Sequence, residues 1–229
     1  MMKLLKIKSI KKIKSFSKKY DIETKYTHNF FANNILVHNS SMSCILLKDE
    51  FNVCSHNLNL KEFDENLGAR TTELKNTFWK VAREQDIEQK IRFYCDKRNI
   101  KEIGIQGELL GEGIQKNKYK LKGHDVYLFN VFNIDTQKYF DWEEFQDLIS
   151  LTGLKQAPIV FETFKLDNLK IDDLLKIVEG QSILNNQTQR EGIVFKTKNK
   201  LDKSIYFHSF GKISFKVINN KFLLKYNDE

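Results

Sequence analysis

The chain has 229 residues, a formal net charge of +8 at pH 7 and 12% aromatic residues. This length allows one or two domains with a sizeable core. No apolar run approaches the ~20 residues that span a bilayer, and charge interrupts the basic start too soon for a signal peptide. The three cysteines lack a Cys-x-x-Cys spacing. They predict neither a disulfide framework nor a zinc site, and the cytoplasm is the expected compartment.

The positive charge is concentrated at the start of the chain. Residues 1–39 hold nine lysines against Asp21 and Glu23, a net charge of +7, so residues 40–229 carry only +1. A uniformly basic chain would favour nucleic acid as the partner. Because the excess lies in the first segment, we expect that segment to meet an acidic polypeptide. A plain RNA-binding module is an alternative that the near-neutral charge of residues 40–229 disfavours.

The first 39 residues predict short strands. Apolar residues alternate with lysines between Leu4 and Ile13, which is typical of strands with one apolar face. A segment of this length cannot bury enough apolar surface to fold alone. It therefore requires a partner, or else it is a disordered basic tail.

The end of this segment contains residues suited to breaking and exchanging peptide bonds. Asn39 can attack its own peptide carbonyl through its side-chain amide and form a succinimide. The imidazole of His38 lies beside that bond and titrates near neutral pH, and His28 is a second candidate for proton transfer. The hydroxyl of Ser40 can hold an ester while the amide bonds are exchanged.

Residues 40–229 predict an α+β fold with an antiparallel bias. Strands are predicted over Met42–Leu47, Asn52–Ser55, 101–115, 124–134, Glu191–Lys196 and Ser214–Ile218, with a turn at Asp49–Phe51 and an extended segment at Pro158–Val160. Helices are predicted within 71–98, over Phe140–Leu154 and over Ile171–Glu179, which Gly180 ends. Asp141 is the expected N-cap of the second of these, with Glu144 three residues on.

Four short segments carry side chains that could take part in chemistry. They are Gln106–Lys118, Val126–Val131, Arg190–Lys196 and Ser214–Val217. Taken singly, each is more consistent with a structural role. The glycines of the first do not fit a dinucleotide or P-loop pattern, and the aromatic second segment is typical of a core strand.

In this order and spacing, the four segments resemble motifs III, IIIa, IV and V of ATP-dependent RNA ligases in the covalent nucleotidyltransferase superfamily. The resemblance implies that Glu108 meets the ribose or the RNA end and that Phe129 stacks on adenine. It implies that Glu191 helps to hold a divalent metal, Mg²⁺. Lys196 and Lys216 would bind the nucleotide and offset phosphate charge during its transfer.

The first segment resembles the C-terminal fragment of a split intein, a half-Hint fold. Tyr20–Ile22, His28 and Ile35–Ser40 carry this resemblance. It implies an N-terminal fragment that is supplied in trans on another polypeptide. The segment begins directly at Met1, which suggests a separately translated piece. Ser40 would attack the upstream junction, and Asn39 would then cyclise with help from His38 and His28.

The nucleophilic lysine of the ligase family, in a Lys-x-Asp-Gly motif, is absent from the chain. In relatives this motif is followed by Ser-Ser-Met, and here Ser40–Met42 follows Asn39 instead. We therefore expect two domains, 1–39 and 40–229, with the second lacking its first strand and motif. The lysine would lie on the partner polypeptide.

The resemblances together imply a chain that is inactive alone. After trans-splicing it would use ATP and Mg²⁺ to seal an RNA 5′-phosphate to a 3′-hydroxyl, through lysyl-AMP and RNA-adenylate. A phage-infected bacterial cell is the expected setting. The alternative is an inactive ligase fragment.

Overall fold

The computed structural model describes residues 30–32, 35–37, 40–55, 58–63, 76–198 and 213–226. The chain divides into two compact units, Met1–His38 and Asn39–Glu229. In the first, strand β1 (Phe30–Ala32) pairs antiparallel with β2 (Ile35–Val37). The strands predicted before residue 30, and the side chains of His28, His38 and Asn39, lie outside the described residues.

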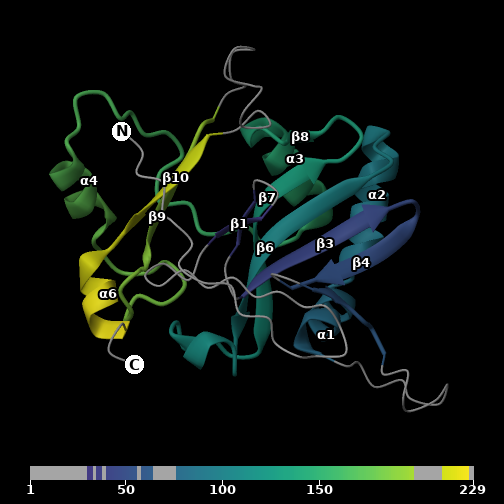
Figure 1. Ribbon diagram of the computed structural model, residues 1–229, viewed down its shortest axis with the longest axis horizontal. Coiled ribbons are helices and arrows are strands. Elements are labelled where there is room, and N and C mark those ends of the chain that lie inside the picture. Colours follow the sequence, from purple (N-terminus) through teal and green to yellow (C-terminus); the bar gives the residue numbers. More distant parts are fainter. Residues whose placement is uncertain are drawn as a thin grey trace, which may run out of the picture. The chain divides into compact units, whose positions relative to one another are not determined.

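The second unit is built on a six-stranded sheet in the order β5-β4-β3-β6-β7-β8. Its strands are β3 (Ser41–Leu47), β4 (Glu50–Cys54), β5 (Asn59–Leu60), β6 (Ile103–Gly111), β7 (His124–Asn133) and β8 (Lys138–Tyr139). Every neighbouring pair is antiparallel, which confirms the α+β class with an antiparallel sheet. Figure 1 shows the long strands β3, β6 and β7 side by side.

The turn between β3 and β4 lies earlier than the sequence predicted. Lys48 and Asp49 both have left-handed backbones, with φ of 49° and 64°. Two consecutive residues of this kind form the tight hairpin turn whose twist matches that of the flanking strands. Glu50 and Phe51, which were predicted to belong to the turn, therefore already pair with β3.

Three helices contribute to the core beside this sheet: α1 (Thr77–Glu84), α2 (Ile87–Arg98) and α3 (Trp142–Thr152). Asp86, at φ 53°, separates the first two. The predicted capping box of α3 is present, since Asp141 accepts from the Glu144 amide and Glu144 accepts from the Asp141 amide. Fully buried residues from strands and helices, among them Ile91 and Leu148, form one apolar cluster.

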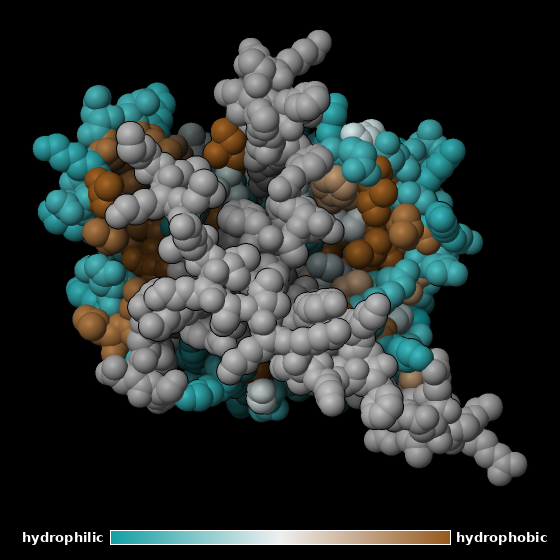
Figure 2. Space-filling view, viewed as in Figure 1, coloured by the Kyte–Doolittle hydropathy of each residue, from teal (hydrophilic) through white to brown (hydrophobic). Residues whose placement is uncertain are grey.

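A second, two-stranded sheet follows in the chain. Strand β9 (Gly192–Lys196) pairs antiparallel with β10 (Ser214–Ile218), and helices α4 (Ile171–Val178) and α6 (Asn220–Tyr226) lie before and after them. Its core is small, consisting of Val178 with two residues of β9 and partly buried neighbours. Apolar residues also show at the surface over α4, β9 and β10 in Figure 2. Helix α6 and a short 3₁₀ turn, η2 (Gln115–Asn117), were not predicted.

Within the described part of the chain, every helix is too short or too polar to cross a bilayer.

Candidate nucleotide-transfer site

One face of the six-stranded sheet carries polar side chains in neighbouring strands. Residues that lie opposite one another in register project to the same side of a sheet. Ser41 lies opposite Glu108, and Gln106 lies between Ser43 and Asn130. The alternate residues of β3, such as Met42, belong to the apolar core on the other side. The alternation therefore assembles a polar row from β3, β6 and β7.

Ser40 and Glu108 are joined at the edge of this row. The Ser40 hydroxyl donates a hydrogen bond to the Glu108 carboxylate. The Ser40 carbonyl accepts from the Leu109 amide at 3.0 Å, which extends the β3–β6 ladder by one residue. Ser40 is 2% exposed, so its hydroxyl lies inside the protein. The sequence predicted a role for each residue separately, and the structure brings them into contact.

The Glu108 carboxyl has a pKa raised to about 7. Burial is the main cause, because removal from water disfavours the charged form. The negative charge of Glu191 raises the pKa further, while the Ser40 hydrogen bond and the positive charge of Lys216 lower it. These influences place Glu108, Glu191 and Lys216 within electrostatic reach of one another.

Lys216 and Glu191 form an ion pair across the second sheet. The Lys216 ammonium donates to the Glu191 carboxylate, and the two side chains are 21% and 36% exposed. In the register, Lys216 lies opposite Val194 and Ile218 lies opposite Gly192. A Cβ at Gly192 would approach the Val217 carbonyl oxygen to 2.2 Å. Any side chain there would push β10 away and separate the pair.

Asn219 holds the start of β9 against the end of β10. Its side chain is fully buried and donates to the Arg190 carbonyl at 2.9 Å and to Gln189 Oε1 at 3.3 Å. Its own amide donates to the Glu191 carbonyl at 2.8 Å. Asn219 therefore fixes the backbone on both sides of the Glu191 carboxylate.

Lys196 joins the second sheet to the first. Its ammonium donates to the Phe129 carbonyl and to Asn130 Oδ1, the latter at 3.1 Å. It also lies 5.4 Å from the centre of the Phe129 ring, within the range of a cation–π contact. The β6–β7 register shifts between Gln106 and Gly107, where Asn130 and Leu128 are the partners, so Phe129 falls at the bulge. A bulge re-aims a side chain, which sets Phe129 apart from the regular ladder.

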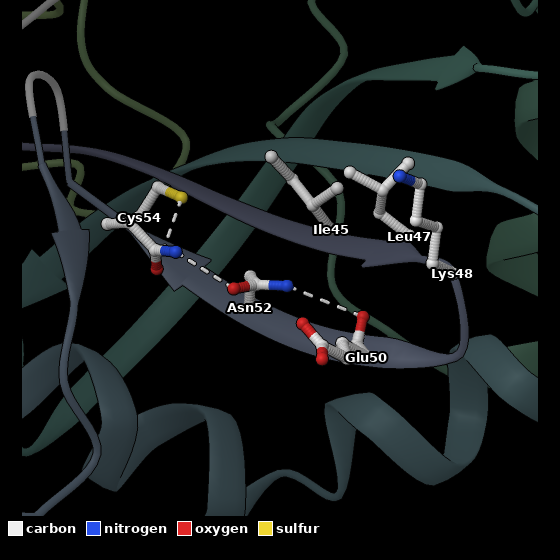
Figure 3. A pocket seen from close by; sticks show the side chains of 7 residues that line it. Ile45, Leu47, Lys48, Glu50, Asn52 and Cys54 are labelled. Carbon is white, nitrogen blue, oxygen red and sulfur yellow. Dashed lines mark hydrogen bonds between the residues drawn. The ribbon is translucent and has the colours of Figure 1, made fainter.

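A pocket of about 290 Å³ lies over β3, β4 and β5, and Figure 3 shows the side chains that line it. They are Ile45, Leu47, Lys48, Glu50, Asn52, Cys54 and Asn59. Asn59 donates to Asn52 at 2.8 Å within it. Ile45 lies opposite both Asn52 and Gly104 in the sheet, so the pocket opens on the same face as the polar row. None of the residues predicted from the sequence to act in catalysis or binding lines it.

The described residues contain no group of three or more His, Cys, Asp and Glu side chains that could hold a metal ion by themselves. Glu108 and Glu191 are nevertheless close enough to affect each other's charge. Such a pair fits Mg²⁺ or a similar hard cation that takes its remaining ligands from water and phosphate oxygens. The metal role predicted for Glu191 stays a prediction.

The structure groups the described candidates in two places. Ser40, Glu108, Glu191 and Lys216 are linked by hydrogen bonds or charge, and Lys196 meets Phe129.

Sequence reasoning gave no individual role to Gln106, Asn130 or Asn219, although the first two lie within the segments Gln106–Lys118 and Val126–Val131. Gln106 and Asn130 are polar residues in otherwise apolar strands, a signal that could have marked them. Asn219 follows the predicted strand directly and resembles an ordinary turn residue.

Comparisons with known proteins identify the family of this chain. The family model described as RNA ligase matches residues 37–218. Solved structures of the Naegleria gruberi RNA ligase are 32% identical, with a TM-score of 0.66, over 84% of this chain and 50% of theirs. They include variants with ATP and Mn and with AMP and Mn, and the ligase with PPi. This chain spans about half the length of those proteins.

No curated protein matches the chain. The family match alone covers well over half of it, beginning at Val37 and ending with the last residue of β10. The chain therefore belongs to the RNA ligase family.

Proposed function

We propose that residues 40–229 form the nucleotidyl-transfer part of an ATP-dependent RNA ligase that gains its nucleophilic lysine by protein splicing. The observation that carries this proposal is the linked group of Ser40, Glu108, Glu191 and Lys216 within a chain of the RNA ligase family. Carboxylates beside an ammonium suit a metal-bound phosphate, because the carboxylates attract the metal ion and the ammonium attracts the phosphate oxygens.

ATP is the proposed nucleotide, and the Naegleria gruberi ligase structures with ATP and Mn support that choice. Phe129 would stack on the adenine, since a flat aromatic ring binds a base by its face. Glu108 would meet the ribose or the RNA end. Lys196 and Lys216 would neutralise phosphate charge. A divalent ion such as Mg²⁺, held with help from Glu191, would supply further neutralisation of the phosphate oxygens.

The proposed reaction has three transfers. The nitrogen of the supplied lysine attacks the α-phosphorus of ATP, forming lysyl-AMP and releasing pyrophosphate. The RNA 5′-phosphate then takes the AMP and frees the lysine. A 3′-hydroxyl finally attacks the activated phosphate, which joins the RNA ends and releases AMP. In each step Lys216 and Lys196 stabilise charge that grows on the transferred phosphate.

The source of the lysine is the second half of the proposal. The family match begins at Val37, close to Asn39, and the whole sequence lacks a Lys-x-Asp-Gly motif. A partner polypeptide with an N-terminal intein half would bring this motif. Ser40 would attack the upstream junction, and Asn39, assisted by His38 and His28, would release the intein. An acyl shift would leave a peptide bond before Ser40.

Nucleotide binding can be tested on the chain itself. We expect calorimetry to detect ATP binding that requires Mg²⁺ or Mn²⁺. Phe129→Ala should weaken it roughly 5- to 160-fold, because stacking on an aromatic contributes about 1–3 kcal/mol per base. Phe93→Ala is the control, since Phe93 is 47% exposed on α2. Equal binding by the parent and Phe129→Ala would contradict the assigned role.

Splicing is tested separately by mass spectrometry. The chain is mixed with a polypeptide that carries an N-terminal intein half behind a segment ending in Lys-x-Asp-Gly. The expected product joins that segment to Ser40 and accepts AMP from ATP, whereas the unmixed chain accepts none. Asn39→Ala should abolish the joined product, while Asn34→Ala should leave it. A joined product from Asn39→Ala would refute the splicing role.

A further inference from the structure

The loop that joins β6 to β7 concentrates positive charge. Residues 112–123 contain four lysines, Lys116, Lys118, Lys120 and Lys122, and Glu112 as the only acidic residue. Its net charge of +3 contrasts with +1 for the whole of residues 40–229. Lys116, Lys120 and Lys122 are exposed. The loop is therefore one of the basic stretches in a part of the chain whose total charge is close to zero, another being residues 90–101 with a net charge of +4.

This loop is held in a defined shape. The Asn117 side chain accepts from the Leu121 amide at 2.9 Å and donates to the Leu121 carbonyl at 2.8 Å. Asn185 donates to the Tyr119 carbonyl at 2.9 Å, which ties the loop to the segment before β9. Lys118 lies 5.3 Å from the centre of the Phe222 ring on α6. The lysine backbone positions are thus fixed before any partner arrives.

Part of the loop has an unusual backbone. Gln115, Lys116 and Asn117 have φ of 44°, 58° and 46°, and Lys120 has 53°. Side-chain-bearing residues rarely take these angles, and runs of them are concentrated at ligand contacts. The conformation brings four lysines into a short stretch beside a hairpin end.

The loop also lies in line with the proposed site. It begins directly after Gly111, three residues along β6 from Glu108. A strand rises about 3.3 Å per residue, so the loop starts about 10 Å from Glu108 along the strand. That distance corresponds to a few nucleotides of a strand whose end is at Glu108.

We propose that residues 112–123 bind the sugar-phosphate backbone of the RNA strand whose end is processed at Glu108. The inference rests on the proposed ligase function and assigns it a substrate-docking surface. Lysine ammonium groups are point charges that contact phosphates without reading sequence. Binding through this loop should therefore be sequence-independent and weaken as salt is raised.

The test uses the full chain and a single-stranded RNA with a 5′-phosphate and a 3′ fluorophore. Anisotropy measures binding by the parent, by Lys120→Ala/Lys122→Ala and by Lys120→Arg/Lys122→Arg. Lys97→Ala/Lys101→Ala is the matched control, because these exposed lysines lie before the opposite end of β6. Residues 1–39 are present in every variant, so their charge contributes equally to each.

The loop variant should bind about 10- to 30-fold more weakly near 0.1 M salt. Its log–log salt slope should be smaller by about 1.4, since each phosphate contact to a single strand contributes about 0.7. The arginine variant and the matched control should retain both values. Bound RNA should also shield Lys120 and Lys122, but not Lys97 and Lys101, from acetylation measured by mass spectrometry.

Parent-like binding and salt slope in the loop variant, or acetylation unaffected by RNA, would overturn the inference. So would a parent chain that binds no RNA. Metal-dependent ATP binding is measured on the same samples. If the parent binds ATP with metal while the loop variant binds RNA normally, the loop inference fails and the proposed ligase function stands. If the parent binds no ATP, the result counts against the proposed function and not against the role of the loop.

Discussion

The hydroxyl of Ser40 donates a hydrogen bond to the carboxylate of Glu108, 68 residues further along the chain. The contact forms because the backbone of Ser40 continues the β3–β6 ladder, which brings it beside Leu109 and Glu108. Under the proposed function, Ser40 acts twice. It first serves as the splicing nucleophile and then holds a carboxylate of the ligase site. Splicing at this residue therefore has to leave an ordinary peptide bond before Ser40 and no additional residues.

Glu108 should make stability depend on pH. Its pKa in the folded protein is about 7, against an ordinary value of 4.5. Because the folded pKa is raised, the stabilisation is complete below about pH 4.5 and is lost as the pH rises through 7. Between pH 5.5 and 8.5, the parent should lose on the order of 2 kcal/mol more unfolding free energy than Glu108→Gln.

Urea unfolding at both pH values, without metal or nucleotide, measures this difference. Glu84→Gln, on the exposed side of α1, should behave like the parent. An unchanged pH dependence in Glu108→Gln would show that the carboxylate is not the group responsible.

Ser40→Cys should separate the two roles of Ser40. A thiol can replace the hydroxyl as nucleophile, so joined product should still form. The thiol is a weaker hydrogen-bond donor, and the Ser40 hydrogen bond lowers the pKa of Glu108. The pKa of Glu108 should therefore rise further in Ser40→Cys, and the pH-dependent loss of stability should shift to higher pH.

Mass spectrometry follows the first outcome and urea unfolding the second, with Ser43→Cys, in the polar row of β3, as the control. Ser40→Ala should give no joined product. Efficient joining by Ser40→Ala would refute the nucleophile assignment.

Lys216→Met should impair transfer of AMP in the joined ligase. The ammonium pairs with Glu191 and its charge lowers the pKa of Glu108, so its loss removes a positive charge that acts on both carboxylates. Loss of one charge-stabilising donor costs about 10²- to 10³-fold in rate. Labelling of the protein with radioactive AMP measures the effect. Lys101→Met should label like the parent, and normal labelling of Lys216→Met would remove Lys216 from the mechanism.

Asn219→Ala should destabilise the second sheet. The change leaves the Arg190 carbonyl without its side-chain donor in a fully buried place, which costs about 1–3 kcal/mol. ATP binding should weaken as well, because the backbone on both sides of Glu191 loses its support.

Urea unfolding and calorimetry check both parts of this prediction. Asn220→Ala is the matched control, since Asn220 is the next residue and is exposed. A variant at Asn219 that keeps parent-like stability and ATP binding would contradict the positioning role.

The sequence by itself determined the family and most of the longer strands and helices of residues 40–229, but not helix α6. The strands predicted over 42–47 and 101–115 are present over 41–47 and 103–111, and the Asp141–Glu144 capping box was predictable because a cap depends on residues three apart. The order of the four motif segments indicated the ligase family, which the family match confirms. Such patterns involve residues close together in the sequence or their order along it, so they can be recognised without knowledge of the fold.

Only the tertiary structure decided which side chains meet. The Ser40–Glu108 bond depends on the β3–β6 register, and the contact of Lys196 with Phe129 depends on how two separate sheets pack. The buried position of Asn219 depends on the pairing of β9 with β10, which brings it against Gln189 and Arg190. No spacing along the chain specifies these contacts, because they join residues that are distant in sequence. The raised pKa of Glu108 likewise comes from burial. Burial is set by the folded molecule and not by the residues next to Glu108 in the sequence.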